Sequence, residues 1–476
     1  MIDTKKLRQK ILDLAIRGKL VPQDPNDEPA SVLLERIHAE KERLIAEGKI
    51  KCPKKSKASS AASHYQNFEP PFPIPDSWEW VRLEDIAKIG TGATPSKSNR
   101  EYYGGNINWV SSSVTSFPYV NEPTDLITEL ALKETNCEIY PTGTLLMAMY
   151  GEGKTRGQLT ELRIEAASNQ ACAAIIPYIS ETKNFVRLYL LANYYQLRRL
   201  AEGGNQPNLN LGKISSLFIP LPPIQEQRRV VEQYGFILES IELLEASKAL
   251  LEERINMAKS KILDLAMQGK LVPQNPADES ASDMLRRINP KANIITDNPH
   301  YPQLPENWVL TTIDSVCLYG NNKTIPVSDI NAEDWILELE DMESYTGRLL
   351  QIKSKKERVI SGSRHSFKSG DILFSRLRTY LNKVHLSTNG GFCSTEMIPI
   401  TPFKCVVSEY LYYWLRSPFF VEYTISCGYG VKMPRLSTSD ANKAIVPLPP
   451  LDEQKRIVET IQRFHDGLDR ISNALN

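Results

Sequence analysis

The chain has 476 residues, of which 41% are hydrophobic and 24% charged, and its 57 basic residues balance its 57 acidic residues. At roughly 100–200 residues per domain, this length predicts two to four domains with apolar cores and excludes a disordered chain or a small disulfide scaffold. A net charge of zero argues at first against a nucleic-acid binder, because neutralising phosphates requires surplus Lys and Arg.

The seven cysteines are scattered and never spaced as Cys-x-x-Cys, so neither a disulfide framework nor a zinc site is indicated. The six histidines lack metal-ligand spacing, and we expect no metal. The sequence contains no signal-peptide core and no run of about 18 apolar residues. We therefore expect a cytoplasmic protein.

Two internal repeats organise the chain. Residues 10–37 match residues 261–288 at 20 of 28 positions, and residues 220–232 match residues 447–459 at 9 of 13 positions. The centre of the chain carries both repeats, whereas each end carries one. This pattern predicts a pseudo-twofold, circular layout in which the two ends together imitate the centre.

Apolar residues recur every three or four positions through the centre, which predicts one helix from about Ile224 to Met267, on the order of 65 Å long. The same spacing at both chain ends predicts terminal helices that pair with it in an antiparallel coiled coil. The alternative is a helix buried in one large domain. The predicted coiled-coil residues are Val230, Tyr234, Ile237, Ile241, Leu244, Leu251, Ile255, Ile262, Leu265, Ile457, Ile461, Phe464 and Leu468.

Between the repeats lie two stretches of weaker mutual similarity, in which Pro75-Asp76-Ser77-Trp78 is echoed by Pro305-Glu306-Asn307-Trp308. Both alternate short apolar runs with Gly, Pro, Ser and Asn and end in an aromatic-rich helical stretch, which predicts two homologous mixed α/β domains in an α+β fold. The predicted segments are a helical segment and linker at 1–69, domains at 70–219 and 301–446, a coiled-coil helix and linker at 220–300, and a terminal helix at 447–476.

The Lys-rich stretch within 48–75 is interpreted as a solvated linker, with a contact to DNA or an anionic partner as the alternative.

Three enzyme-like motifs are incomplete, so we predict no catalytic residue. Gly90-Thr91-Gly92-Ala93-Thr94-Pro95 has proline where a dinucleotide-binding turn needs its third glycine. Gly153-Lys154-Thr155 follows Ala148, where a phosphate loop needs its first glycine. Glu69-Pro70-Pro71-Phe72 resembles an amino-methyltransferase motif but begins with a side chain that is too long.

Charge becomes informative once it is divided by segment. In the second domain an all-acidic run over 329–343 precedes a stretch with ten basic and two acidic residues, from Arg348 to Lys383. This stretch suits DNA binding, and a solvated face paired with the acidic run is an equal alternative. Its candidates for DNA binding are Lys353, Lys355, Lys356, Arg358, Arg364, Arg376 and Arg378. The first domain, with 13 basic and 15 acidic residues, offers a polar and aromatic set comprising Arg100, Tyr102, Tyr103, Asn108, Ser111, Ser112, Lys154 and Arg156.

With these features the sequence resembles the specificity subunits of type I restriction-modification systems. The resemblance rests on Pro-Leu-Pro-Pro-x-x-Glu-Gln at 220–227 and 447–454 and on Gly-Lys-Leu-Val-Pro-Gln at 18–23 and 269–274, and it covers essentially the whole chain. It implies two target-recognition domains, each reading half of a bipartite double-stranded DNA site, held at a fixed distance by helices. It also implies partners: two modification subunits that bind S-adenosylmethionine and methylate adenine, and restriction subunits that cut foreign DNA.

The resemblance implies no cofactor and no active site in this chain. Two other classes of protein remain open from the residues alone. One is a coiled-coil adaptor that bridges partners through two binding domains, and the other is an enzyme with a novel site in the aromatic-rich domains.

Overall fold

The computed structural model describes residues 3–50, 68–151, 154–200, 208–296, 304–320, 323–430 and 432–475. The chain forms two compact units, residues 1–245 and 246–476, and the long helix α8 (Ile224–Met267) runs from the first into the second. Its bounds agree with the predicted helix. The lysine-rich part of the predicted linker, residues 51–67, lies outside the described residues.

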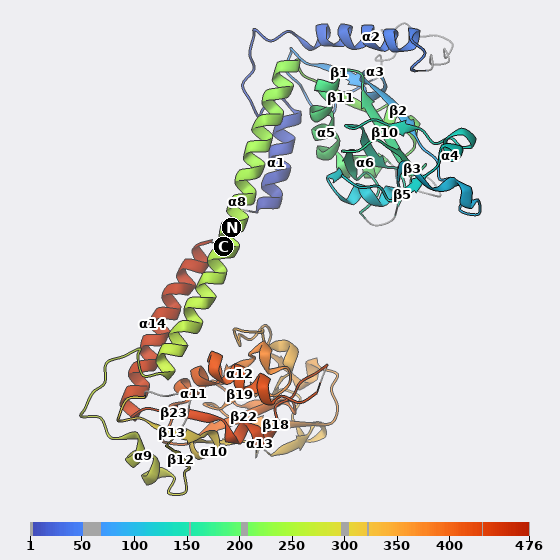
Figure 1. The fold of residues 1–476 in the computed structure, drawn as a ribbon. Coiled ribbons are helices and arrows are strands. Elements are labelled where there is room, and N and C mark those ends of the chain that lie inside the picture. The colour runs from blue at the N-terminus through green and yellow to red at the C-terminus, as the bar shows by residue number, and fades with distance from the viewer. Residues whose placement is uncertain are drawn as a thin grey trace. The chain divides into compact units, whose positions relative to one another are not determined.

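In the first unit, α1 (Thr4–Ile16) lies along the N-terminal part of α8 (Figure 1). Arg8 near the start of α1 pairs with Glu245 at 2.9 Å, whereas Asp27, beyond the end of α1, pairs with Arg229 at 2.5 Å. Because the start of one helix meets the later part of the other, the two helices are antiparallel. This confirms the pairing predicted for the N-terminal helix.

The second unit repeats this arrangement with α14 (Leu451–Leu475) against the C-terminal part of α8. Lys259 of α8 pairs with Asp469 at 2.5 Å, and Arg456 near the start of α14 pairs with Asp278 at 2.6 Å. The antiparallel pairing predicted for the C-terminal helix is therefore also confirmed.

Burial along the predicted coiled-coil residues is uneven. Val230, Ile241, Ile255, Ile457 and Ile461 are buried. The half-buried positions are Tyr234, Ile237, Ile262, Leu265 and Leu468. The exposed positions, with 50%, 38% and 46% of their surface accessible, are Leu244, Leu251 and Phe464. For these three the prediction of a buried seam is wrong. Leu244 and Leu251 lie in the part of α8 where α1 begins and α14 ends, whereas Phe464 lies on α14 itself.

The mixed domain of the first unit contains a central five-stranded sheet and a second four-stranded sheet. The central sheet has the order β2-β10-β7-β8-β4, and the second has the order β5-β3-β9-β6. The strands of the central sheet are β2 (Ala87–Thr91), β10 (Cys172–Pro177), β7 (Leu145–Ala148), β8 (Leu159–Leu162) and β4 (Tyr119–Val120). Those of the second sheet are β5 (Asp125–Ile127), β3 (Tyr103–Val110), β9 (Ala166–Ser168) and β6 (Ile139–Tyr140).

Helices cover the central sheet of this domain and join it to the helix pair. The helices of the first unit besides α1 and α8 are α2 (Ala30–Ala46), α3 (Leu83–Ile86), α4 (Glu129–Glu134), α5 (Lys183–Ala192), α6 (Tyr194–Leu200) and α7 (Leu211–Ser215). One hydrophobic core includes Phe185 of α5, Met147 of β7 and Val230 of α8. The mixed domain therefore folds onto its part of α8.

The mixed domain of the second unit has the same central sheet order. Its four-stranded sheet has the order β14-β22-β19-β20, which repeats β2-β10-β7-β8 of the first domain without the edge strand β4. These strands are β14 (Cys317–Tyr319), β22 (Met397–Pro402), β19 (Ile372–Ser375) and β20 (Val384–Leu386). Its helices are α9 (Ala281–Ile288), α10 (Ile313–Val316), α11 (Ser408–Leu415), α12 (Pro418–Cys427) and α13 (Thr438–Lys443).

The second sheet of this domain differs from that of the first. It has five strands in the order β15-β18-β21-β16-β17. They are β15 (Thr324–Pro326), β18 (Ser363–Phe367), β21 (Gly391–Ser394), β16 (Trp335–Leu337) and β17 (Lys353–Ser354). A shared central sheet with a divergent second sheet confirms the prediction of two homologous mixed domains.

Each copy of the Pro-Leu-Pro-Pro motif joins a strand to a long helix. The strand β11 (Phe218–Leu221) pairs with β1 (Glu79–Arg82) and leads into α8. The strand β23 (Ile445–Leu448) pairs with β13 (Val309–Thr312), beside β12 (Ile294–Ile295), and leads into α14. Pro220 and Pro447 lie within these ladders, and the next two prolines, which have no backbone N–H to donate, follow the last paired residue of each strand.

The Glu and Gln of the motif are buried at the start of each helix. The Gln227 side chain donates to the Pro222 carbonyl at 2.9 Å, which fixes the entry of the chain into the helix. Gln23 donates to the Glu226 carboxylate, and Gln274 donates to Glu453 at 2.8 Å. Burial raises the pKa of both carboxyls. In each unit, therefore, residues of one sequence repeat contact residues of the other.

Within the described ranges, no helix combines the length and the apolar character needed to cross a bilayer. The same ranges hold no group of three or more His, Cys, Asp or Glu side chains that could bind a metal. The dinucleotide-like turn at 90–95 begins inside β2, where a Cβ on Gly92 would lie 1.6 Å from the Ser168 carbonyl oxygen. This glycine therefore allows the close approach of two backbones.

Candidate nucleic-acid interface

One hairpin loop occurs at the same end of the central sheet in both domains. In the first domain it joins β7 to β8, and Ala148 N donates to Gln158 O at 2.9 Å across its base. In the second it joins β19 to β20, and Ser375 N donates to Lys383 O at 3.0 Å. We call these two segments, residues 149–158 and 376–383, the hairpin loops.

A second segment supports each hairpin loop in the same way. Leu209 N donates to Met149 O at 3.1 Å, and Leu436 N donates to Arg376 O at 2.9 Å. The two leucines occupy matching places in the two repeats, 227 residues apart, as do Met149 and Arg376. Four of the residues predicted to bind DNA lie on these equivalent loops: Lys154, Arg156, Arg376 and Arg378.

In the first hairpin loop the backbone is fixed while basic side chains remain accessible. The Tyr194 hydroxyl of α6 donates to Lys154 O at 2.5 Å, and Arg198 donates to Arg156 O at 3.1 Å. The Lys154 side chain is exposed, and that of Arg156 is half-buried. Residues 152 and 153, which include the glycine of the phosphate-loop-like motif, lie outside the described residues.

In the second hairpin loop Arg376 belongs to a small charged group. Arg376 lies 3.9 Å from the Glu396 carboxylate, which also accepts a hydrogen bond from Arg435 at 2.8 Å. Arg376 also donates to the Tyr429 hydroxyl at 3.4 Å. Two arginines thus share one carboxylate, and this part of the domain keeps a positive excess.

The backbone of the second hairpin loop is strained. Arg378 and Asn382 have φ of 51° and 46°, and Tyr345, whose N–H donates to Leu381 O at 2.8 Å, has φ of 65°. These are the non-glycine residues with positive φ in the described part of the chain. Each such residue costs on the order of 1–3 kcal/mol, and such strain concentrates at functional sites. The strain marks this loop as a functional candidate independently of its charge.

The other candidates of the first domain lie on β3 and the short turns beside it, and most of their polar groups are already bonded. The Tyr102 hydroxyl donates to Glu134 at 2.7 Å, the Tyr103 hydroxyl to Pro95 O at 2.6 Å, and the Asn108 amide to Glu165 O at 2.9 Å. Ser111 bonds Ser113 at 2.7 Å, and the Ser112 carbonyl accepts from Thr115 at 2.8 Å. Arg100 is exposed. Their contact with DNA stays a prediction.

The basic stretch of the second domain pairs largely with the preceding acidic run. Lys356 pairs with Glu333 at 2.6 Å, and Arg364 pairs with Glu338 at 2.8 Å. Lys355 donates to the Ile330 carbonyl, and Lys353 is half-buried in β17. The alternative of a face paired with the acidic run therefore describes most of this stretch.

Arg358 is a correction to the predicted interface. It pairs with Asp341, and the exposed fractions of the two side chains are 5% and 0%. Asp341 also accepts hydrogen bonds from Gln351 at 2.7 Å and from Glu338 N at 2.7 Å. A buried ion pair holds the domain together, so the placement of Arg358 in the DNA interface is wrong.

Sequence reasoning missed the exposed aromatic and apolar side chains around the hairpin loops. Tyr150 is 39% exposed in the first loop and Tyr380 is 40% exposed in the second. Tyr429 and Met433 are exposed beside Arg376 and Arg378. The nearby glycines and arginines in the sequence were only a weak signal that these side chains belong to the interface, because aromatic residues are more often buried than exposed.

Comparison with known proteins decides the identity of the chain. The family model described as "Type I restriction modification DNA specificity domain" matches residues 75–253 and 305–476. The chain belongs to this family. Membership confirms the expected DNA-specificity subunit and the expectation that this subunit is not itself an enzyme.

Individual relatives span nearly the whole specificity subunit. The Escherichia coli type I restriction enzyme EcoAI specificity subunit is 26% identical, with 97% of this chain and 88% of the relative covered. The HsdS subunit from Thermoanaerobacter tengcongensis shares the fold at a TM-score of 0.51 and 16% identity, with 86% of this chain and 94% of that chain covered. A chain from a structure of complex assembly and conformational transition of the type I R-M system gives a TM-score of 0.54 at 16% identity, with 85% and 94% covered.

Proposed function

We propose that each recognition domain reads one half of a bipartite, asymmetric DNA site through its hairpin loop. The observation that carries this proposal is the equivalent position of the two loops combined with their different residues. The first loop carries Lys154 and Arg156, whereas the second carries Arg376 and Arg378 at the places where the first has Met149 and Gly151. Side chains of Arg and Lys select guanine edges in the major groove, and different side chains at one position select different bases.

The helices set the distance between the two half-sites in this proposal. α8 is one continuous helix of 44 residues, and an antiparallel partner helix stiffens it in each unit. Proteins that read two half-sites fix their spacing geometrically. A helix that rises 1.5 Å per residue can serve as such a ruler.

The helices also recruit partners in this proposal. Leu243, Leu244 and Leu251 of α8 are exposed, and apolar surface of this kind suits a protein contact. The partners would be two modification subunits, which would hold S-adenosylmethionine and methylate adenine, and restriction subunits. Because such a complex acts on chromosomal and incoming DNA, we place it in the cytoplasm.

Reconstitution tests the proposal. The chain is mixed with the modification subunits and S-adenosylmethionine, a randomised DNA library is methylated, and the modified adenines are sequenced. We expect one bipartite site with a spacer of fixed length, with the modification subunits alone as the control. The isolated chain should show no tight sequence-specific binding. Methylation without site preference by the full complex would refute the proposal.

A further inference from the structure

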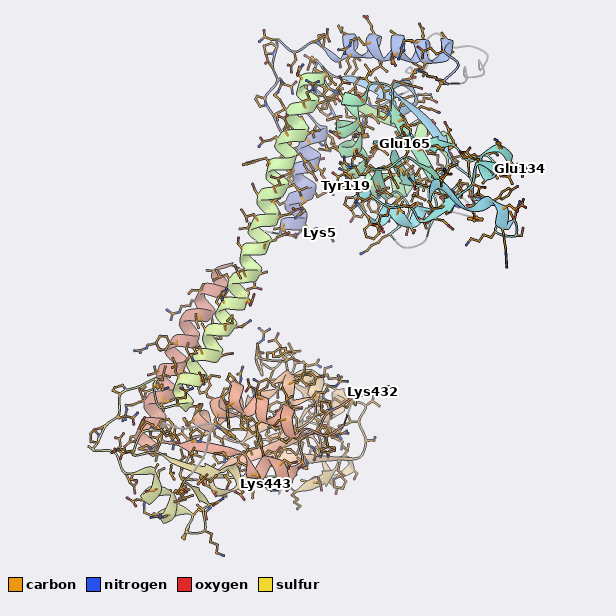
Figure 2. All side chains as sticks on the ribbon, in the orientation of Figure 1. Lys5, Tyr119, Glu134, Glu165, Lys432 and Lys443 are labelled. Atoms are coloured by element: carbon orange, nitrogen blue, oxygen red, sulfur yellow. The ribbon has the colours of Figure 1, made fainter. Side chains whose placement is uncertain are left out.

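Two arginines of the first domain stack on one exposed tyrosine at the edge of the central sheet. The guanidinium of Arg163 lies 4.3 Å from the centre of the Tyr119 ring, and that of Arg187 lies 4.8 Å from it. Tyr119 belongs to the edge strand β4, and Arg187 belongs to α5. Figure 2 shows Tyr119 at the edge of the domain nearest α1. We call these three residues the arginine–tyrosine cluster.

The cluster carries positive charge that its neighbours do not cancel. The nearby carboxylate is that of Glu161, which is buried and bonds Lys183 at 2.8 Å, while Arg163 lies 3.8 Å from it. Lys183 and Arg163 therefore share this one acid, and Arg187 on the Tyr119 ring adds a further positive charge. This local surplus stands out in a domain that has more acidic than basic residues overall.

Stacking leaves donors of the exposed Arg163 guanidinium available to a ligand, whereas the Nε of Arg187 is buried. A guanidinium that lies on an aromatic ring is held through its face, whereas its N–H groups point outward in its plane. Arg187 uses one such group on the Pro118 carbonyl at 3.2 Å, and 49% of the Arg163 side chain is exposed. Oriented donors with a net positive charge are suited to bidentate binding of a phosphate.

The position of the cluster relative to the hairpin loop favours DNA over a protein partner. Gln158 closes the loop, and Arg163 follows at the other end of β8, roughly 15 Å away at the rise of an extended strand. The major groove is about 12 Å wide between its flanking backbones. A domain that inserts its loop into the groove would therefore bring the cluster to one of the flanking phosphate chains.

We infer that the arginine–tyrosine cluster binds the DNA backbone beside the half-site of the first domain, independently of sequence. The inference rests on the proposed function and assigns different roles to different residues. The hairpin loop selects the bases, and Arg163 and Arg187 position the duplex. Phosphate contacts of this kind fix the register of a protein on DNA but carry no sequence information.

The salt dependence of binding by the reconstituted complex tests the inference. For the Arg163→Gln/Arg187→Gln variant, the slope of log affinity against log salt should fall by about 0.9 per lost contact, about 1.8 in all. At about 0.15 M salt this corresponds to roughly fivefold weaker binding per contact. The loss should be equal on cognate and non-cognate DNA. The matched control is Arg36→Gln/Arg43→Gln on α2, which removes the same charge elsewhere in the unit and should leave the slope unchanged.

Three further measurements keep the outcome clear. Arg163→Gln alone, at the more exposed arginine, should give half the change in slope, and Arg163→Lys should restore most of it. An unchanged slope in the double variant overturns the inference, as does loss of the modification subunits on size exclusion, which would show a protein contact. An altered half-site would show base reading instead and also overturn it. Failure of the proposed function appears separately, as a wild-type complex without site preference.

Discussion

The indole nitrogen of Trp78 donates a hydrogen bond of 2.8 Å to the buried carboxylate of Glu226, although 148 residues separate the two in the sequence. Trp308 lies beside Glu453 in the second unit. Each tryptophan stands in the Pro-x-x-Trp sequence at the start of a recognition domain, and each glutamate stands in the first turn of a long helix. The hydrogen bond ties the recognition domain to its helix in the first unit, and the second unit places its tryptophan and glutamate side by side in the same way.

Replacing this carboxylate distinguishes the role of its hydrogen bonds from that of its charge. Glu226→Gln retains an oxygen that can accept from Trp78, whereas Glu226→Ala leaves buried donors unsatisfied and should cost about 1–3 kcal/mol per donor. Burial raises the pKa of Glu226, so its contribution to stability is full below the unfolded pKa and is lost as pH rises through the folded pKa. In thermal unfolding, the stability of Glu226→Gln relative to wild type should therefore increase from pH 4 to pH 7.5. A difference that does not change with pH contradicts this.

The helices and the pseudo-symmetry could be predicted from the sequence because they depend on local periodicity and on identity between repeats. The period that begins at Val230 predicts α8, and the repeats predict the equivalent contacts of Glu226 and Glu453. The exposure of Leu244 and Leu251 could not be predicted, because it depends on where the partner helices stop.

The interface was harder to predict because Arg358 and Arg378 are residues of the same type in the same basic stretch. Arg358 is buried only because the chain folds back to place it on Asp341, 17 residues earlier. Arg378 remains on a loop because β19 ends before it. Whether an arginine of this stretch is buried or lies on a loop follows from strand pairing and not from residue type.

The buried pair of Arg358 and Asp341 should act on stability and not on DNA specificity. Arg358→Ala leaves the Asp341 charge without its cation, which typically costs about 3–5 kcal/mol. Lys356→Ala breaks an exposed pair with Glu333 and should cost under about 1 kcal/mol. Calorimetric unfolding of both variants checks the contrast. Equal small losses would show that Arg358 is not a structural residue.

His465 on α14 should make the second unit sensitive to acid. Burial, together with Lys259 and Arg416 nearby, lowers the pKa of His465 to about 4, although Asp469 opposes this. The unfolded chain takes up a proton near pH 6.5 while the folded chain does not, so this group costs stability progressively as pH falls from about 6.5 to 4. His465→Gln should lose less stability than wild type over this range in thermal unfolding. An identical pH dependence of the two proteins would exclude this role.

An insertion into α8 tests its role as a ruler. Four residues added after Lys248 lengthen the helix by about 6 Å, close to the length of two base pairs. We expect a bipartite site whose spacer changes by about that amount, or loss of recognition, with both half-sites unaltered. Sequencing of methylated adenines provides the readout, and Lys248→Ala is the control that should leave the spacer unchanged. Altered half-sites with the original spacer would contradict the proposal that α8 sets the length of the spacer.

The hairpin loops make the most direct prediction about specificity. Arg378→Asn removes the guanidinium while tolerating the left-handed backbone, since asparagine adopts positive φ more readily than most residues. It should relax only the half-site read by the second domain, by about 1–3 kcal/mol if the contact is bidentate to guanine. Arg376→Ala should act on the same half-site, and Arg156→Ala should relax only the other one. Competition between DNA duplexes that differ in a single half-site measures both effects. Because the two loops occupy equivalent positions in separate domains, equal relaxation at both half-sites would show that these arginines do not read bases.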